Sequence, residues 1–165
     1  MRKAISALCL YLLAAVTCMA KEPHRISCGE LARPSQSVLK LTHSISLVYV
    51  TTYYELCAPD RFGGSAQLLV LREKWTGKKV VVEPSNVVAL DNANYEQLVS
   101  LLNRALKFNT EANFPPVVDG TSTCLETQRS CYLKVCFWDI EYQTEAKGLS
   151  GMVALSSRLV ALGSK

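Results

Sequence analysis

The segment that begins at Leu39 alternates between apolar and polar residues, and this pattern limits the possible folds more than any other feature of the chain. The odd positions are mainly apolar and the even positions polar, in the order Leu39, Lys40, Leu41, Thr42, His43, Ser44, Ile45, Ser46, Leu47 and Tyr49. A period of two places alternate side chains on opposite faces, so the segment is predicted to be a β-strand with one buried face. We expect the strand to break or bulge near His43 and Ser44.

Several other segments have the composition of β-strands. They cover residues 48–56, 67–73, 79–83, 87–90, 121–125 and 130–138. A loop is expected over residues 58–65, which contain proline, aspartate and paired glycine. Residues 67–73 and 79–83 are predicted to form a hairpin with its turn around Thr76 and Gly77. Pro84 should end this hairpin, because proline has no N–H to donate.

Two segments have helical periodicity. The first begins at Asp91 or Asn92, whose side chain can accept free N–H groups, and its apolar residues recur at helical spacing at Tyr95, Leu98, Val99, Leu102 and Leu106. The second covers residues 149–162, with Gly163 as its stop. The sequence therefore predicts an α+β fold in which two helices pack on an antiparallel sheet of about five to seven strands.

Residues 1–20 have the pattern of a secretory signal peptide. Arg2 and Lys3 precede an apolar run over residues 7–16, and small or neutral residues lead to a predicted cut after Ala20. The run is too short to span a bilayer core of about 30 Å. Export to the periplasm or the medium is therefore predicted.

The remaining chain is predicted to comprise an irregular segment, residues 21–36, and a single α+β domain, residues 37–165. An alternative is lipid attachment at Cys18, but Thr17 is an unfavourable residue before a lipidated cysteine. No second long apolar segment follows. Without the leader, the chain has 16 basic and 14 acidic side chains, which gives a net charge of +2. This near-neutral charge argues against nucleic acid or an anionic membrane as the main partner.

Three cysteines lie close together in the stretch TCLETQRSCYLKVCFWD, at Cys124, Cys131 and Cys136. A zinc site needs ligands in short pairs, and a thioredoxin-like centre needs CxxC; the chain has no CxxC and only two histidines. No metal and no cofactor are predicted. Export to an oxidising compartment instead favours disulfides.

The pairing of these cysteines is less determined. A hairpin turn centred between Thr127 and Gln128 would place Cys124 opposite Cys131, and Cys28 with Cys57 is the second expected pair. Cys136 is then the expected free thiol. Five cysteines with one left over allow about fifteen arrangements, which sequence alone does not rank.

A cationic hairpin tip with an exposed tryptophan is the main candidate contact loop. It contains Arg72, Trp75 and Lys78, and aromatic and arginine residues are favoured anchors in protein interfaces. A solvated turn is the alternative interpretation. Asp119 and Trp138 are further candidate binding residues.

The order of features in the last part of the chain resembles that of small secreted bacterial proteins. It consists of YEQL, an aromatic at Phe108, then DGTSTCLE and a strand with Tyr132 and Trp138. The resemblance implies no activity. Exported proteins of this build are often inhibitors, immunity factors or accessory binders, so binding of another protein is the function that we predict.

Two other functions stay open. A small envelope hydrolase would use Asp119, Glu126 or His43, although no GxSxG, HExxH or P-loop motif supports an enzyme class. A structural envelope component would assemble through a free Cys136.

Overall fold

The computed structural model describes residues 27–60, 63–107, 120–127, 132–140 and 148–164. Its helices and strands follow in the order η1 (Cys28–Glu30), β1 (Ser37–Ile45), η2 (Ser46–Val48), β2 (Val50–Cys57), β3 (Ala66–Trp75), β4 (Val80–Val82), β5 (Asn86–Leu90), α2 (Asn92–Ala105), β6 (Thr121–Thr127), β7 (Leu133–Trp138) and α3 (Ser150–Gly163). Here η denotes a short 3₁₀ helix. The predicted leader lies outside the described residues.

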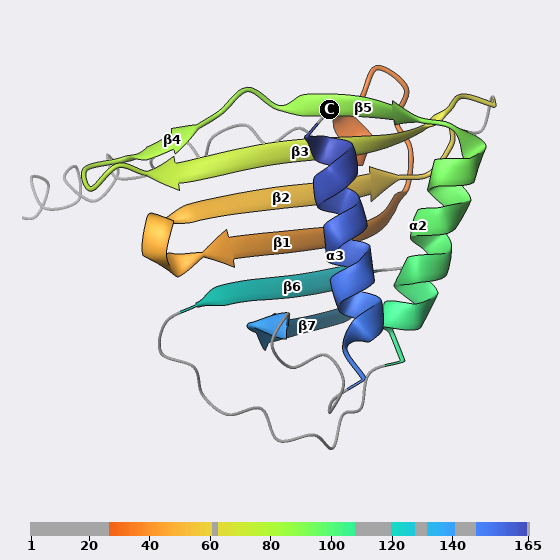
Figure 1. Ribbon diagram of the computed structural model, residues 1–165. Helices are drawn as coiled ribbons and strands as arrows, with labels where there is room; N and C mark the ends of the chain where they lie inside the picture. Colours follow the sequence, from red (N-terminus) through yellow and green to blue (C-terminus); the bar gives the residue numbers. More distant parts are fainter. Residues whose placement is uncertain (1–26, 61–62, 108–119, 128–131, 141–147, 165) are drawn as a thin grey trace, which may run out of the picture.

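The strands form one antiparallel sheet in the order β4-β3-β2-β1-β6-β7. β5 also pairs with β3, so β4 and β5 lie one after the other along the same edge of that strand (Figure 1). With seven strands and the two helices α2 and α3, the predicted α+β fold is confirmed.

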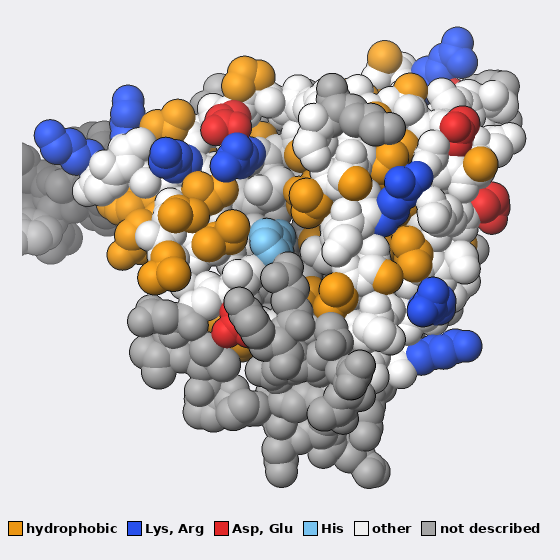
Figure 2. All heavy atoms as spheres, in the orientation of Figure 1, with side chains coloured by type: hydrophobic (Ala, Val, Ile, Leu, Met, Phe, Trp, Pro, Cys, Tyr) orange, Lys and Arg blue, Asp and Glu red, His pale blue; other side chains and the backbone are white. Residues whose placement is uncertain are grey.

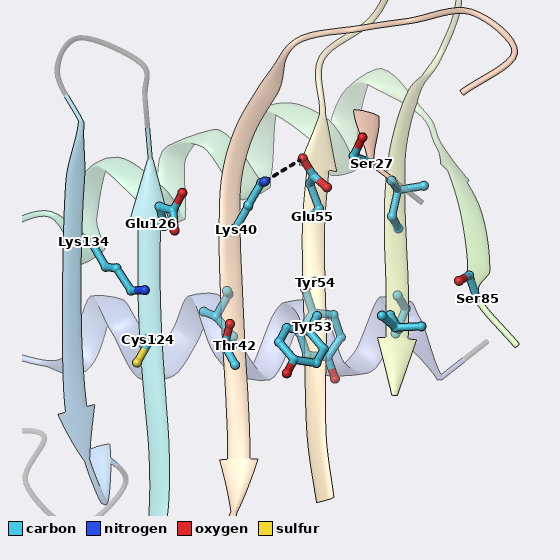
Figure 3. A pocket seen from close by; sticks show the side chains of 14 residues that line it. Ser27, Lys40, Thr42, Tyr53, Tyr54, Glu55, Ser85, Cys124, Glu126 and Lys134 are labelled. Carbon is cyan, nitrogen blue, oxygen red and sulfur yellow. Dashed lines mark ion pairs between the residues drawn. The ribbon is translucent and has the colours of Figure 1, made fainter. Parts of the chain in front are cut away.

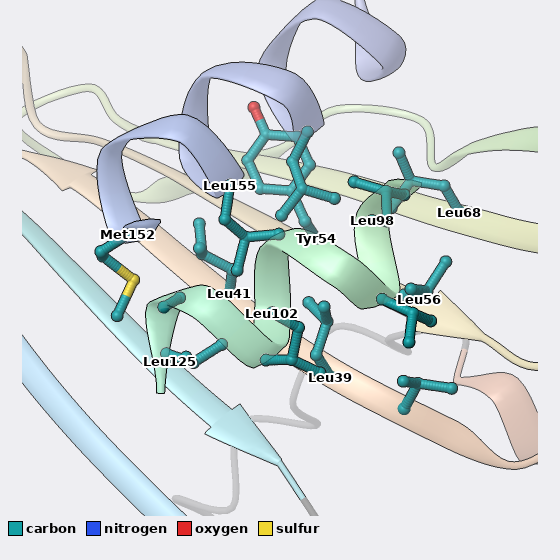
Figure 4. Packing of buried hydrophobic residues seen from close by; sticks show 14 of the residues in the cluster. Leu39, Leu41, Tyr54, Leu56, Leu68, Leu98, Leu102, Leu125, Met152 and Leu155 are labelled. Atoms are coloured by element: carbon teal, nitrogen blue, oxygen red, sulfur yellow. The ribbon is translucent and has the colours of Figure 1, made fainter. Parts of the chain in front are cut away.

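Both helices pack on the same face of the sheet, which we call the covered face (Figure 1). Leucines at alternate positions of the strands lie on this face, and the helices contribute leucines and a methionine (Figure 4). Among the described residues, the largest fully buried side chains are Leu39, Leu41, Leu56, Leu68, Leu98, Leu102, Leu125, Ile140, Leu149, Met152, Leu155 and Leu159. Each buried leucine or methionine stabilises the fold by about 1.5–3 kcal/mol relative to an exposed one. The alternation seen at Leu39 and Leu41 therefore marks the covered face.

The backbones of α2 and α3 approach each other very closely at Gly151. A Cβ atom built on Gly151 of α3 would lie 2.6 Å from the carbonyl carbon of Arg104 and 2.7 Å from the N atom of Ala105, both in α2. The missing side chain thus lets the two backbones meet. At the other end of α2, the Asp91 carboxylate accepts the N–H of Asn94 at 2.7 Å, which is the cap that the sequence indicated.

The first strand differs from the prediction in where it is interrupted, because its register with β2 shifts between Ser37 and Leu39 and is regular from there on. His43 and Ser44 pair without interruption with Thr52 and Thr51 of β2, so the break expected there is wrong. The strand ends after Ile45, and the chain turns through η2 to Tyr49, whose φ of 50° is left-handed. Turning here takes the odd-numbered Leu47 and Tyr49 out of the strand, and both are exposed.

One disulfide attaches the segment before β1 to the uncovered face. Cys28 in η1 bonds to Cys57 at the end of β2, with a Cα–Cα distance of 5.5 Å, and this is the pair that the sequence analysis chose. The two cysteines pack with Leu69 of β3 and Leu31 in a small apolar cluster. This cluster is separate from the main core.

The second disulfide corrects the prediction. Cys124 bonds to Cys136, its direct partner in the β6–β7 register, so the pairing with Cys131 and the assignment of Cys136 as a free thiol are both wrong. The intervening stretch ETQRSCY has no glycine, proline or asparagine that would fix a turn. The pairing of β6 with β7 therefore sets the register. In this register, the midpoint between the two strands falls later in the sequence than the predicted turn. Cys131 lies outside the described residues.

Replacing Gly151 with alanine should destabilise the protein by about 2 kcal/mol, because the new methyl group would overlap the backbone of α2. The gain of up to about 1 kcal/mol in helix propensity is too small to offset this overlap. Denaturant unfolding would measure the change. Gly29→Ala is the matched control, because its Cβ would have only Ser27 Oγ nearby, at 3.9 Å. Equal stability of the two variants would contradict the close helix contact.

Peptide mapping of the non-reduced protein should recover one fragment that joins Cys124 to Cys136 and another that joins Cys28 to Cys57. The β6–β7 register is the physical reason for the first pair, because directly opposed residues are close enough to bridge. Mass spectrometry before and after reduction provides the measurement. A fragment that joins Cys124 to Cys131 would refute the register.

Candidate functional site

Two strand connections meet at one end of the sheet. The first is η2 with Tyr49, between β1 and β2, and the second is the turn between β3 and β4. The N–H of Trp75 donates to the carbonyl oxygen of Tyr49 at 2.9 Å, which ties the two connections together. Val80 pairs directly with Trp75 across the second turn. The two connections thus form one continuous surface.

Large apolar side chains are exposed on this surface. Their exposed fractions are 75% for Leu47, 53% for Val48, 65% for Tyr49, 42% for Trp75 and 52% for Val80. We call these five residues the tip patch. Figure 2 shows hydrophobic side chains gathered at this end of the molecule, with Lys and Arg side chains above them. Single exposed apolar residues are ordinary, but a contiguous group marks a place of interaction.

Three lysines adjoin the tip patch. Lys74, Lys78 and Lys79 are exposed and flank Trp75 along the β3–β4 connection. Among the residues that the structure describes, none of these three lysines lies within ion-pair distance of a carboxylate. Their charges therefore add to a positive potential around the apolar patch. The predicted contact loop thus presents an exposed Trp75 beside Lys78 and two further exposed lysines.

Arg72, which the sequence grouped with Trp75, lies in a different place. It is three residues earlier on β3, so its side chain is on the covered face, where its Nη1 atom lies 3.9 Å from Glu83 Oε2. It lines a hollow of about 420 Å³ with His43 and Tyr54, next to the end of α3. Burial raises the pKa of Tyr54, and the positive charge of Arg72 opposes part of that rise.

The candidate acid–base residues do not form a site together. His43 is on the covered face, with its Nδ1 atom 3.2 Å from Thr123 Oγ1. Glu126 lies three residues beyond Thr123 on β6, so its side chain is on the opposite face of the sheet. Asp119 lies outside the described residues. The sheet thus separates the two described groups that the hydrolase alternative would use.

The uncovered face carries a row of alternating charges that the sequence analysis did not identify. Directly paired positions on β7, β6, β1 and β2 are Lys134, Glu126, Lys40 and Glu55. Lys40 Nζ lies 3.6 Å from Glu55 Oε1 (Figure 3). Cross-strand pairs of opposite charge stabilise a sheet by about 0.2–1 kcal/mol each. The four charged residues were visible in the sequence, but the order of the strands that places them in one row was not.

This charged row borders a groove of about 450 Å³ on the uncovered face. Tyr53, Leu69 and Leu71 form its apolar side, and the alternating charges form its polar side (Figure 3). Because positive and negative groups alternate along the row, their fields largely cancel. The groove therefore has a weaker net field than the tip, where three exposed lysines have the same sign.

Trp138, a further candidate from the sequence, reaches the same end of the sheet as Trp75. The two tryptophans line a shallow groove of about 260 Å³ on the uncovered face. Sequence reasoning named both residues, but it had no means of placing them together, because their strands are separated by β2, β1 and β6 in the sheet.

In the part of the chain that the structure describes, no three His, Cys, Asp or Glu side chains gather where they could hold a metal ion. None of the described helices has the length and apolar character that crossing a membrane requires. The two disulfides are typical of proteins that fold in an oxidising compartment.

No protein family model matches the chain, and the curated proteins and the solved structures likewise give no match.

Replacing Leu47 with serine should change the free energy of unfolding by less than about 0.5 kcal/mol, because the leucine side chain is exposed. Leu41→Ala is the contrasting variant, and it should cost about 2–5 kcal/mol because Leu41 is fully buried on the covered face. Urea unfolding would measure both. A loss above 1 kcal/mol at Leu47, well beyond the range of about ±0.5 kcal/mol for surface changes, would mean that the tip patch is packed.

Proposed function

We propose that the chain is an exported, disulfide-containing protein that binds another protein through the tip patch, as an inhibitor or immunity-like protein does. The observation that carries this proposal is the contiguous exposure of Leu47, Val48, Tyr49, Trp75 and Val80. Apolar area exposed to water gains free energy when a partner covers it, at roughly 25 cal/mol per Å². Tryptophan and tyrosine are also the side chains that most often dominate protein interfaces.

The lysines define the chemistry of the partner. Lys74, Lys78 and Lys79 are at the rim of the patch, so the partner presents an apolar pocket surrounded by acidic side chains. Complementary charge at a rim mainly speeds association and excludes wrong partners. Binding is therefore faster at low ionic strength, where exposed charges are less screened.

The sheet supports the patch as a rigid platform. Close to the tip, β2 and β3 are paired from Val50 with Lys74 onward, and the Trp75–Tyr49 hydrogen bond joins the two connections. A surface that is already ordered loses little conformational entropy when it binds. This preorganisation suits a protein that recognises one partner.

Two further observations support export. Residues 1–20 have the pattern of a signal peptide, and the two disulfides are of the kind formed in oxidising compartments. A structural component that assembles through Cys136 would need a free thiol at that position, but Cys136 is bonded to Cys124. The hydrolase alternative gains nothing from His43 and Glu126, which lie on opposite faces.

A photoreactive amino acid at position 47 should crosslink the partner protein in the compartment to which the chain is exported. The same group at position 160 is the control, because Val160 is 42% exposed but lies on α3, away from the tip. Mass spectrometry of the crosslinked product identifies the partner. Crosslinks from position 160 alone, or to lipid from position 47, would contradict the proposal.

Reversing charge at the rim with Lys78→Glu and Lys79→Glu should slow association with the purified partner by about tenfold and reduce its dependence on salt. Stopped-flow or biosensor kinetics would measure the two rate constants. Lys134→Glu, on the distant strand β7, is the matched control and should leave the association rate unchanged. An equal effect of both changes would show that the tip is not the contact surface.

A further inference from the structure

The groove between the two tryptophans has an ordered floor. Trp138 of β7, Ser122 of β6, Ser44 of β1 and Thr51 of β2 occupy directly paired positions across four strands. Trp75 closes the groove on the β3 side. The register places all of these strand side chains on the uncovered face. Small hydroxyl side chains therefore form a floor between two aromatic ends.

The floor retains hydrogen-bonding capacity. Ser44 Oγ and Thr51 Oγ1 lie 3.1 Å apart and share one hydrogen bond. A hydroxyl offers one donor and two acceptor positions, so this pair keeps one hydrogen and several lone pairs for a ligand. Ser46 has a different role, because its Oγ donates to the Gly120 carbonyl at 2.6 Å and accepts the Gly120 N–H at 3.0 Å. Ser46 thus holds the end of the groove in place.

None of the described residues that line the groove carries a formal charge, although Glu73 of β3 lies directly opposite Thr51 on the same face. The described residues that line it are Ser44, Ile45, Ser46, Tyr49, Val50, Thr51, Trp75, Ser122 and Trp138, and all of them are uncharged. Trp75 is 42% exposed and Trp138 is 44% exposed, so part of each indole remains accessible. An uncharged site with aromatic and hydroxyl groups favours a neutral ligand that offers C–H surfaces and many hydroxyls. Sugar rings have both properties, because C–H groups lie on their faces and hydroxyls on their edges.

The dimensions of the sheet favour an extended ligand. From β7 to β3 there are four strand-to-strand steps of about 4.8 Å, or roughly 19 Å in all. A ligand that reaches both tryptophans must therefore span several strands. A chain of sugar rings can do so while its hydroxyls meet Ser122, Ser44 and Thr51 in turn.

We propose that this groove binds a neutral oligosaccharide, with Trp75 and Trp138 stacking on sugar rings and Ser44, Thr51 and Ser122 bonding to sugar hydroxyls. This function goes beyond protein binding at the tip patch. It depends on Trp138, which the tip patch does not include.

The two tryptophans of the groove are the only two in the chain, so every tryptophan signal of the folded protein comes from a residue that lines this groove. Titration with chitotetraose, cellotetraose and maltotetraose up to about 10 mM should give a saturable change for at least one of them. An oligogalacturonate of similar length is the charged comparison, and it should bind more weakly. Absence of any saturable change with the three neutral sugars would overturn the proposal.

Trp138→Ala should weaken sugar binding by at least about tenfold, as expected when a stacked aromatic ring is removed. The Trp75 signal and a calorimetric titration would measure the loss, and circular dichroism would verify that the variant is folded. Trp138→Phe keeps an aromatic ring and should retain most of the affinity. Unchanged binding in Trp138→Ala would place the sugar elsewhere and refute the proposal.

The control Leu47→Ser separates this proposal from protein binding at the tip. The substitution removes an exposed residue of the tip patch, and Leu47 is not among the residues that line the groove. The variant should therefore capture the protein partner more weakly and keep its affinity for sugar. Trp138→Ala should weaken sugar binding and leave capture of the protein partner intact. Loss of sugar binding in Leu47→Ser would show that the groove is not an independent site.

Discussion

The two helices cover only one face of a seven-stranded sheet, and the rest of the structure depends on this asymmetry. On the covered face, leucines from every central strand pack against α2 and α3, and Gly151 lets the helix backbones meet. Among the described residues, the other face has no α-helix and carries only the short η1, so it is held differently. Two disulfides, a short apolar cluster around Leu69 and a row of alternating charges stabilise it. The fold thus combines one buried layer with one accessible layer.

The accessible layer explains why the candidate sites lie where they do. Both the tip patch and the tryptophan groove are at the end of the sheet that α2 and α3 do not reach (Figure 1). Their side chains come from paired strands and short connections, so the backbone under them is fixed by ladder hydrogen bonds. The two surfaces meet at Tyr49 and Trp75. A protein partner and a sugar chain would consequently occupy neighbouring positions on one rigid platform.

Local sequence patterns predicted the elements well where a single strand or helix decided the outcome. The alternation at Leu39 and Leu41 identified the covered face, and Asp91 identified the start of α2. Prediction was wrong where pairing between distant segments decided it. Leu47 and Tyr49 continue the alternation but leave the strand after Ile45, so the pattern marked as buried two side chains that are exposed. Likewise, the stretch between Cys124 and Cys136 contains no turn residue that fixes a register, so only the completed sheet could select this disulfide.

The central position of β1 has a consequence for the order of folding. One edge of β1 pairs with the neighbouring β2, but the other pairs with residues 121–127 of β6, far along the chain. During synthesis, the N-terminal half can form the β1–β2–β3 meander, yet one side of β1 stays without its strand until the last third of the chain arrives. Pairing over such separations is slow because a long loop must close first. A newly made chain therefore exposes this edge until the segment that forms β6 has been synthesised.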